Sequence, residues 1–117
     1  MSNAKQTLNE LFEICLEKNA TDLHLSPGFA PILRIDSDLV SLKEKPVLSE
    51  EETKELGLSL LSPEQQEKFW AQKDIDFSFA YQGKARFRVN LYQQMGKVSV
   101  AFRYLSSRVR TIEELHL

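Results

Sequence analysis

The chain has 117 residues, of which 42% are hydrophobic and 27% charged, and its formal net charge is −2. These proportions are typical of a globular domain and exclude an intrinsically disordered chain, a collagen-like repeat and a disulfide scaffold. The length predicts a single domain, because two cores of half this size would each be marginal. A general nucleic-acid binder normally carries an excess of basic residues, so the slightly acidic balance argues against nucleic acid as a partner.

Targeting signals and cysteine usage favour a cytoplasmic location. Uninterrupted apolar runs are only a few residues long, and the N-terminus lacks a basic stretch followed by an apolar run. Neither a membrane span nor a signal peptide is therefore predicted. The single cysteine, Cys15, cannot form an internal disulfide, which suits a reducing compartment. Cys15 lies on the apolar stripe of a predicted helix, so we expect a buried, inert thiol.

The first part of the chain predicts helices and short strands. Residues 1–6 are expected to be a tag-like or disordered start, and a helix with an apolar stripe is predicted from Thr7. Thr7 and Glu10 resemble a capping box for this helix. Short apolar or alternating runs predict strands at 22–26, 32–35 and 39–42. Two further helices are predicted at 49–61 and 62–72, because each begins with a serine followed by acidic residues or proline.

The last third of the chain has the clearest pattern. Apolar and polar residues alternate over 74–81, 85–92 and 98–105, which predicts an antiparallel three-stranded meander with one buried face. The order helix, strands, helices, strands predicts an α+β fold, with an antiparallel sheet of about six strands and helices packed on one face. The predicted core residues are Leu11, Phe12, Leu23, Leu25, Phe77, Phe79, Phe87, Val89, Val100 and Phe102.

No set of residues predicts a catalytic or metal site. The four glycines of the chain form neither a GxxxxGK[ST] phosphate loop nor a GxGxxG turn. Cys15 with the distant His24 and His116 makes a poor ligand set for zinc, so no metal is expected. Polar residues at 22 and 24, and at 74 and 76, share strand faces, where aspartates usually bond backbone N–H groups. We therefore expect no catalysis by this chain alone.

Three arginines of the meander are its most informative polar residues. Keeping the apolar residues on one face allows two registers for the second strand pair. One register sets Arg86 opposite Arg103, and the other, shifted by two residues, sets Arg88 opposite Arg103. Either register brings like charges together among small side chains, which is destabilising unless something negative lies there. A carboxylate of this chain or solvent can satisfy the arginines, and so can a partner or an anion; the sequence leaves both readings open.

Six segments resemble motifs of the secretion-type hexameric ATPases. They are 19–28 (NATDLHLSPG), 32–39 (ILRIDSDL), 74–79 (DIDFSF), 85–90 (ARFRVN), 101–104 (AFRY) and 111–115 (TIEEL). Their order and spacing are most similar to the type IV pilus retraction ATPases, the PilT family of twitching motility. The resemblance covers almost the whole chain, and the matched motif positions include Asp22, His24, Asp76 and Asn90.

The resemblance implies a fold and a function. Residues 7–110 would form a PAS-like N-terminal domain, and 111–117 would begin a linker to a RecA-like motor domain that holds ATP and Mg²⁺. The chain itself would hold no cofactor and no catalytic residue, while the longer protein would be an ATPase. By motif position, Arg86, Arg88 and Arg103 are implied to lie near the nucleotide or at a subunit interface.

The resemblance also implies partners. These are the motor domains of the chain's own and neighbouring subunits in a hexamer, and the pilus machinery of the inner membrane. The chain would be cytoplasmic and peripheral to that membrane, and would serve subunit packing and nucleotide-linked domain motion. The alternative is a PAS-type small-ligand sensory or dimerisation module. Two positions depart from the motifs: Ser37 replaces the usual turn glycine, and His116 stands where a glycine is common.

Overall fold

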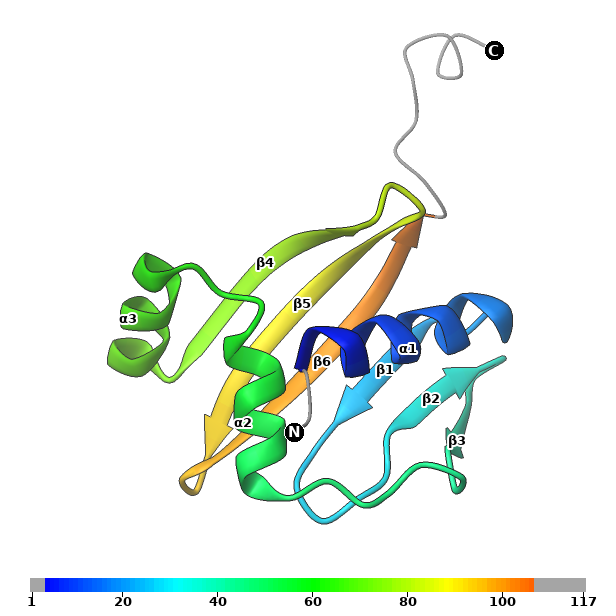
Figure 1. The fold of residues 1–117 in the computed structure, drawn as a ribbon, viewed down its shortest axis with the longest axis horizontal. Helices are drawn as coiled ribbons and strands as arrows, with labels where there is room; N and C mark the ends of the chain where they lie inside the picture. Colours follow the sequence, from blue (N-terminus) through cyan, green and yellow to red (C-terminus); the bar gives the residue numbers. More distant parts are fainter. Residues whose placement is uncertain (1–3, 107–117) are drawn as a thin grey trace, which may run out of the picture.

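The computed structural model describes residues 4–106, so the expected linker at 111–117 and His116 lie outside the described range. The elements in chain order are α1 (Ala4–Glu17), β1 (Asp22–Leu25), β2 (Ile32–Ile35), β3 (Asp38–Ser41), α2 (Glu50–Leu58), α3 (Pro63–Gln72), β4 (Asp74–Tyr81), β5 (Ala85–Gln94) and β6 (Lys97–Ser106). The strands form one antiparallel sheet in the order β3-β2-β1-β6-β5-β4. Helices α1 and α2 lie across one face of it (Figure 1). The expected α+β architecture is confirmed.

The helix starts follow local capping chemistry in two cases out of three. Ser49 caps α2 and Ser62 caps α3, which confirms the two predicted helix starts. Each serine forms a complete capping box with the residue three positions on. The predicted capping box at Thr7 is wrong, because α1 begins at Ala4 and Thr7 lies inside the helix. Residues 4–6, expected within a disordered start, are helical, and Ala4 packs against the core from this extra turn.

The register of β5 on β6 decides which arginines meet. Leu91 lies opposite Val100, and Arg88 lies opposite Arg103. The register that sets Arg86 against Arg103 is therefore wrong, and the alternative shifted by two residues is correct. The cause is the two-residue turn at Met95–Gly96, where both residues have positive φ values of 53° and 80°. Such a tight hairpin turn makes the residues that flank it a pair and so fixes the register from the turn as far as Phe87, beyond which the register shifts.

The core lies between α1, α2 and the sheet. Phe12 of α1 is fully buried, and its ring centroid lies 4.8 Å from that of Phe87, 5.2 Å from Phe102 and 5.1 Å from Tyr81. Eight of the ten predicted core residues are buried: Leu11, Phe12, Leu23, Leu25, Phe87, Val89, Val100 and Phe102. Phe77 and Phe79 are only partly buried, because β4 is an edge strand of the sheet.

Gly57 allows α2 to lie close to the sheet. A Cβ atom added at this position would collide with Cδ1 of Leu91 and come within 3.2 Å of Cγ2 of Val100. Both side chains belong to the buried face of β5 and β6. The glycine lowers the helix propensity of α2, and this cost is offset by the closer packing of the helix on the strands.

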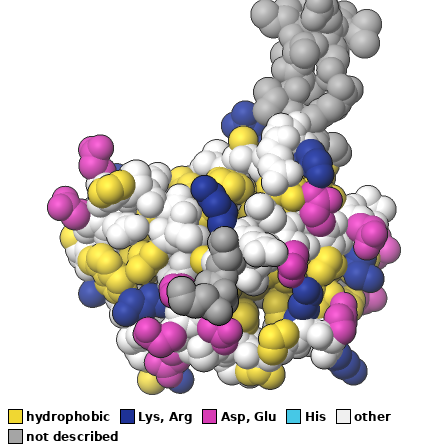
Figure 2. All heavy atoms as spheres, in the orientation of Figure 1, with side chains coloured by type: hydrophobic (Ala, Val, Ile, Leu, Met, Phe, Trp, Pro, Cys, Tyr) yellow, Lys and Arg dark blue, Asp and Glu magenta, His cyan; other side chains and the backbone are white. Residues whose placement is uncertain are grey.

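The helix-covered side of the molecule carries both signs of charge. Figure 2 shows acidic and basic side chains interspersed over this side, without a broad region of one sign. None of the helices within residues 4–106 is long and apolar enough to cross a membrane.

Candidate functional site

The sheet face opposite α1 and α2, which we call the open face, collects the polar residues singled out in the sequence. Residues directly opposite one another on paired strands point to the same side of a sheet. Asp22 pairs with Arg34 on β2 and with Arg103 on β6, and Arg103 pairs with Arg88 on β5. The open face carries all seven predicted site residues: Asp22, His24, Asp76, Arg86, Arg88, Asn90 and Arg103.

Five charged residues of the open face follow one another across five strands, and we call them the charged row. Arg34, Asp22, Arg103 and Arg88 lie directly opposite one another on β2, β1, β6 and β5. Asp76 of β4 joins Arg88 diagonally, because Ser78 is the residue directly opposite Arg88. Nε of Arg103 lies 3.3 Å from Oδ2 of Asp22, and Nη2 of Arg88 lies 3.1 Å from Oδ2 of Asp76. Nε of Arg34 lies 3.9 Å from Oδ1 of Asp22. Each of the two opposed arginines therefore has its own aspartate, and the two aspartates lie on opposite sides of the arginine pair.

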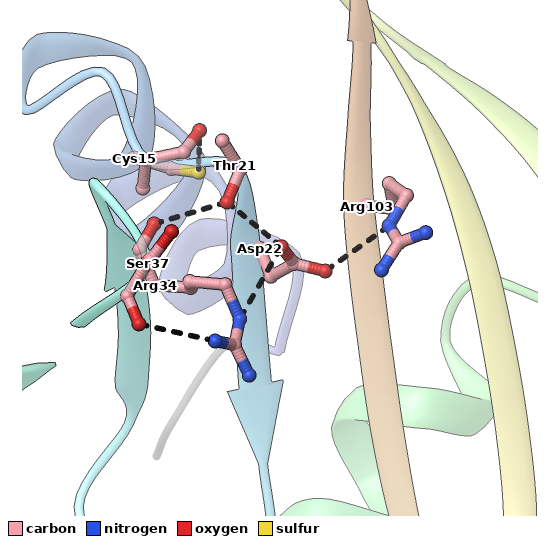
Figure 3. A network of polar contacts seen from close by, with 7 residues as sticks. Cys15, Thr21, Asp22, Arg34, Ser37 and Arg103 are labelled. Atoms are coloured by element: carbon pink, nitrogen blue, oxygen red, sulfur yellow. Dashed lines mark hydrogen bonds and ion pairs between the residues drawn. The ribbon is translucent and has the colours of Figure 1, made fainter. Parts of the chain in front are cut away.

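Asp22 is the one charged residue that is buried within residues 4–106. Its two carboxylate oxygens have different partners, as Figure 3 shows. Oδ2 accepts from Arg103, while Oδ1 accepts a 2.8 Å hydrogen bond from the Thr21 hydroxyl and faces Arg34. Arg34 is itself fixed, because its Nη1 donates to the carbonyl oxygen of Ser37 at 3.3 Å. Sequence reasoning missed Arg34, although it lies within one of the quoted motifs.

Both opposed arginines line a shallow cavity of about 190 Å³ on the open face. Its lining residues are Asp22, Asp76, Arg88, Asn90, Ala101, Phe102 and Arg103. The small side chain of Ala101 leaves the space open, as expected from the small residues beside the arginines. Side chains of Arg88 and Arg103 are 64% and 70% exposed, so both guanidinium groups reach solvent beside this cavity.

The remaining predicted residues surround the charged row. Asn90 donates through Nδ2 to Oδ1 of Asp74 at 2.9 Å, which ties β5 to the start of β4. His24 is half-buried and lies opposite Ala101 on β6. Arg86 is half-buried at the start of β5, where the register against β6 shifts, and no carboxylate of residues 4–106 forms an ion pair with it. The structure thus brings Arg88 and Arg103 together and leaves Arg86 two positions away along β5.

The turn that carries Ser37 keeps a left-handed backbone despite the missing glycine. Asp36 and Ser37 have φ values of 50° and 73°, and they join β2 to β3 as a two-residue hairpin turn. Residues other than glycine adopt this conformation at a cost, so Ser37 stores a small strain at the turn.

The described residues contain neither a reactive thiol nor a cluster of metal-binding side chains. Burial raises the pKa of the Cys15 thiol to about 11, so this cysteine is protonated at neutral pH. No group of three or more His, Cys, Asp or Glu side chains within residues 4–106 is arranged to hold a metal ion.

The chain is similar in sequence to type IV pilus ATPases. No protein-family model matches the chain. The chain is 35% identical over 108 residues to the type IV pilus retraction ATPase PilT of Pseudomonas aeruginosa, a match that covers 92% of the chain and 31% of the relative. It is 28% identical over 108 residues to the type IV pilus ATPase PilU of the same organism, covering 92% and 28%.

Solved structures give the same result for the fold. The crystal structure of the pilus retraction motor PilT with bound ADP superposes with a TM-score of 0.79 and 31% identity, over 90% of this chain and 31% of that one. The ATPase DotB of Legionella pneumophila superposes with a TM-score of 0.70 at 20% identity, over 95% and 31%, and shows the fold alone. The chain spans about a third of the length of these relatives.

The open antiparallel sheet of six strands with its three helices matches the N-terminal domain of PilT. The chain is homologous to the PilT and PilU type IV pilus ATPases over 92% of its length, which confirms the resemblance found in its motifs.

Proposed function

We propose that this chain is the non-catalytic N-terminal domain of a hexameric ATPase that retracts type IV pili in twitching motility. The homology with PilT over 92% of the chain supports this proposal. The chain has no glycine-rich phosphate loop, and lone arginines lack the backbone cradle that holds a triphosphate. ATP and Mg²⁺ would therefore be held by a RecA-like motor domain of the longer protein, and this chain would assist from outside the phosphate loop.

The observation that carries the proposal is the pair of opposed arginines on the open face. Arg88 and Arg103 lie directly opposite each other, and like charges in that position repel. Asp76 and Asp22 bind them from the neighbouring strands, and the two arginine side chains remain 64% and 70% exposed. Both guanidinium groups can therefore also bind a negatively charged group of another domain. That group is the phosphate of a nucleotide or an acidic side chain of a neighbouring subunit. Arg86 would extend the same surface along β5.

The proposed role is subunit packing and nucleotide-linked domain motion. An exposed ion pair costs little to rearrange, and Arg88 and Asp76 are both largely exposed. The open face can therefore exchange internal ion pairs for contacts with the motor domain of its own or a neighbouring subunit. The pilus machinery of the inner membrane would be the further partner, and the protein would act in the cytoplasm, peripheral to that membrane.

The packing of the core argues against the alternative of a PAS-type small-ligand sensor. Such a sensor needs an internal space between sheet and helices. Here the buried Phe12 ring occupies the middle of that space, stacked on Phe87 and in contact with the rings of Tyr81 and Phe102. The cavity of about 450 Å³ that Phe12 also lines lies at the side of the core, between α1, the turn after α2 and the edge strand β4. A dimerisation module has no specific observation in its favour.

The first test uses the gene and the full-length protein. The sequence downstream of this chain is expected to contain GxxxxGK[ST], and the full-length protein is expected to hydrolyse ATP. The 117-residue chain alone is expected to show neither turnover nor tight nucleotide binding by isothermal titration. A downstream sequence without a phosphate loop, or micromolar ATP affinity of this chain alone, would contradict the proposal.

A further inference from the structure

The connection between Asp22 and Arg103 is asymmetric. Asp22 is buried, with its side chain 9% exposed, whereas the Arg103 side chain is 70% exposed. Arg103 donates to Asp22 through Nε, the nitrogen nearest the chain. This arrangement leaves the N–H groups of the two terminal nitrogens available to other acceptors. An arginine bound in this way is fixed at Nε, while its two terminal nitrogens can bind a ligand.

Asp22 is in turn held from its other side. Thr21 donates to Oδ1 at 2.8 Å, and Arg34 faces the same oxygen at 3.9 Å. The Thr21 hydroxyl also lies 3.3 Å from the carbonyl oxygen of Arg34, so β1 and β2 are tied together at this point. A buried carboxylate with several partners keeps one geometry, because any displacement would leave its charge unpaired at high cost.

We propose that Asp22 is a positioning residue, which fixes Arg103 through Nε so that its terminal nitrogens stand beside Arg88 and can bind a phosphate-type oxyanion. The inference deepens the proposed function and rests on it for the identity of the physiological anion. Holding a flexible side chain in place before it binds removes part of the entropy cost of binding. Two guanidinium groups side by side supply the planar donors that match phosphate oxygens.

The charge of Asp22 makes the test decisive. A purely electrostatic view predicts that Asp22→Asn strengthens anion binding, because a negative charge beside the cavity is removed. The positioning role predicts the opposite, since Arg103 loses its anchor. Asp38→Asn is the matched control: it removes the same charge from an exposed residue of β3 outside the charged row.

The measurement is made on the 117-residue chain by NMR, with sodium tripolyphosphate as the probe at constant ionic strength. Asp22→Asn is expected to weaken tripolyphosphate binding by about three- to tenfold relative to Asp38→Asn, as expected for a loss of pre-organisation. The Nε–H group of Arg103 is expected to be rigid in the wild type and in Asp38→Asn, and mobile in Asp22→Asn. Equal or tighter binding by Asp22→Asn, or an Arg103 group that is mobile already in the wild type, would overturn the inference.

One further variant and the full-length protein keep the test interpretable. If Asp22→Asn does not fold, Thr21→Val removes one of the bonds to Asp22 and is expected to give an intermediate mobility of Arg103; an unchanged Arg103 in this folded variant counts against the inference. A full-length protein without ATPase activity would contradict the proposed function, but it would not contradict the positioning of Arg103 by Asp22. An active ATPase in which Arg103 is mobile would defeat only the positioning role.

Discussion

Arg88 and Arg103 lie directly opposite each other on β5 and β6, yet each makes its ion pair with an aspartate on the strand beyond, Asp76 at 3.1 Å and Asp22 at 3.3 Å. The two pairs are unequal, because Asp22 is buried while the Asp76 side chain is 46% exposed. Loss of Arg88 therefore releases an exposed carboxylate, which water can solvate. Loss of Arg103 leaves a buried carboxylate that still has Arg34 and Thr21 as partners.

Phe12 is the central contact between α1 and the sheet. Phe12→Ala is expected to lower the free energy of unfolding by about 3–5 kcal/mol, because the ring is fully buried and its removal leaves a cavity. Chemical denaturation of the chain measures this loss. Phe29→Ala is the control: Phe29 is 58% exposed, and its removal is expected to change stability by less than about 0.5 kcal/mol. Similar losses for both variants would contradict the packing described.

Gly57 is expected to resist a substitution that normally stabilises helices. Gly57→Ala gains about 1 kcal/mol of helix propensity, but its methyl group collides with the buried Leu91 and overpacks the core by about 1–3 kcal/mol. A net destabilisation of up to about 2 kcal/mol is expected in denaturant unfolding. The loss should shrink in a Leu91→Ala background, where the colliding side chain is absent. A Gly57→Ala variant more stable than the wild type would show that α2 does not pack this closely.

The turn between β2 and β3 offers a stabilising substitution. Ser37 has a φ of 73°, so Ser37→Gly is expected to raise the free energy of unfolding by about 0.5–1 kcal/mol through relief of backbone strain. Ser41→Gly, in the extended strand β3, is expected to lower it by a similar amount. Thermal unfolding of the two variants should therefore shift in opposite directions, and a shift in the same direction would exclude a left-handed Ser37.

The ionisation of Tyr81 makes the stability of the folded chain depend on pH in the alkaline range. Burial raises the pKa of Tyr81 to about 12, and its hydrogen bond to Glu13 acts in the same direction. The folded state therefore favours the neutral phenol: this contribution is complete below pH 10, the ordinary pKa, and is lost as the pH rises toward 12. The free energy of unfolding of the wild type, relative to that of Tyr81→Phe, should be constant up to about pH 10 and fall above it.

Glu13, the hydrogen-bond partner of Tyr81, makes stability depend on pH in the acid range. Hydrogen bonds from Lys84 and Tyr81 lower the pKa of Glu13 below its ordinary value of 4.5. The contribution of Glu13 is therefore present above pH 4.5 and lost as the pH falls below it. On the alkaline side, a difference in stability between the wild type and Tyr81→Phe that stays constant from about pH 8 to about pH 12 would contradict the raised pKa of Tyr81.

Local chemistry explains which parts of the fold could be predicted. The capping boxes at Ser49 and Ser62 lie within four consecutive residues, so the sequence alone places the starts of α2 and α3. The register of β5 on β6 also had a local signal, because a two-residue turn at Met95–Gly96 permits only the pairing in which Arg88 meets Arg103.

Non-local arrangement explains what sequence reasoning missed. Strand β1 lies between β2 and β6, and this order joins segments about 80 residues apart, for which no local pattern exists. Only that order brings Arg34 and Arg103 to the two sides of Asp22. The incomplete burial of Phe77 and Phe79 has the same origin, since alternation shows which face is apolar but not that β4 is an edge strand.

The central claim, that the opposed arginines serve the motor rather than the fold of this domain, is tested most directly by Arg88→Ala in the full-length protein. In the 117-residue chain this variant is expected to change the free energy of unfolding by less than about 1 kcal/mol, because its ion pair with Asp76 is exposed and repulsion with Arg103 is relieved. In the hexamer it is expected to lower the ATPase rate by at least about tenfold. Lys43→Ala, an exposed residue of the loop after β3, is the control of equal charge and should leave the rate unchanged. Normal ATPase turnover of a folded Arg88→Ala hexamer would contradict the account.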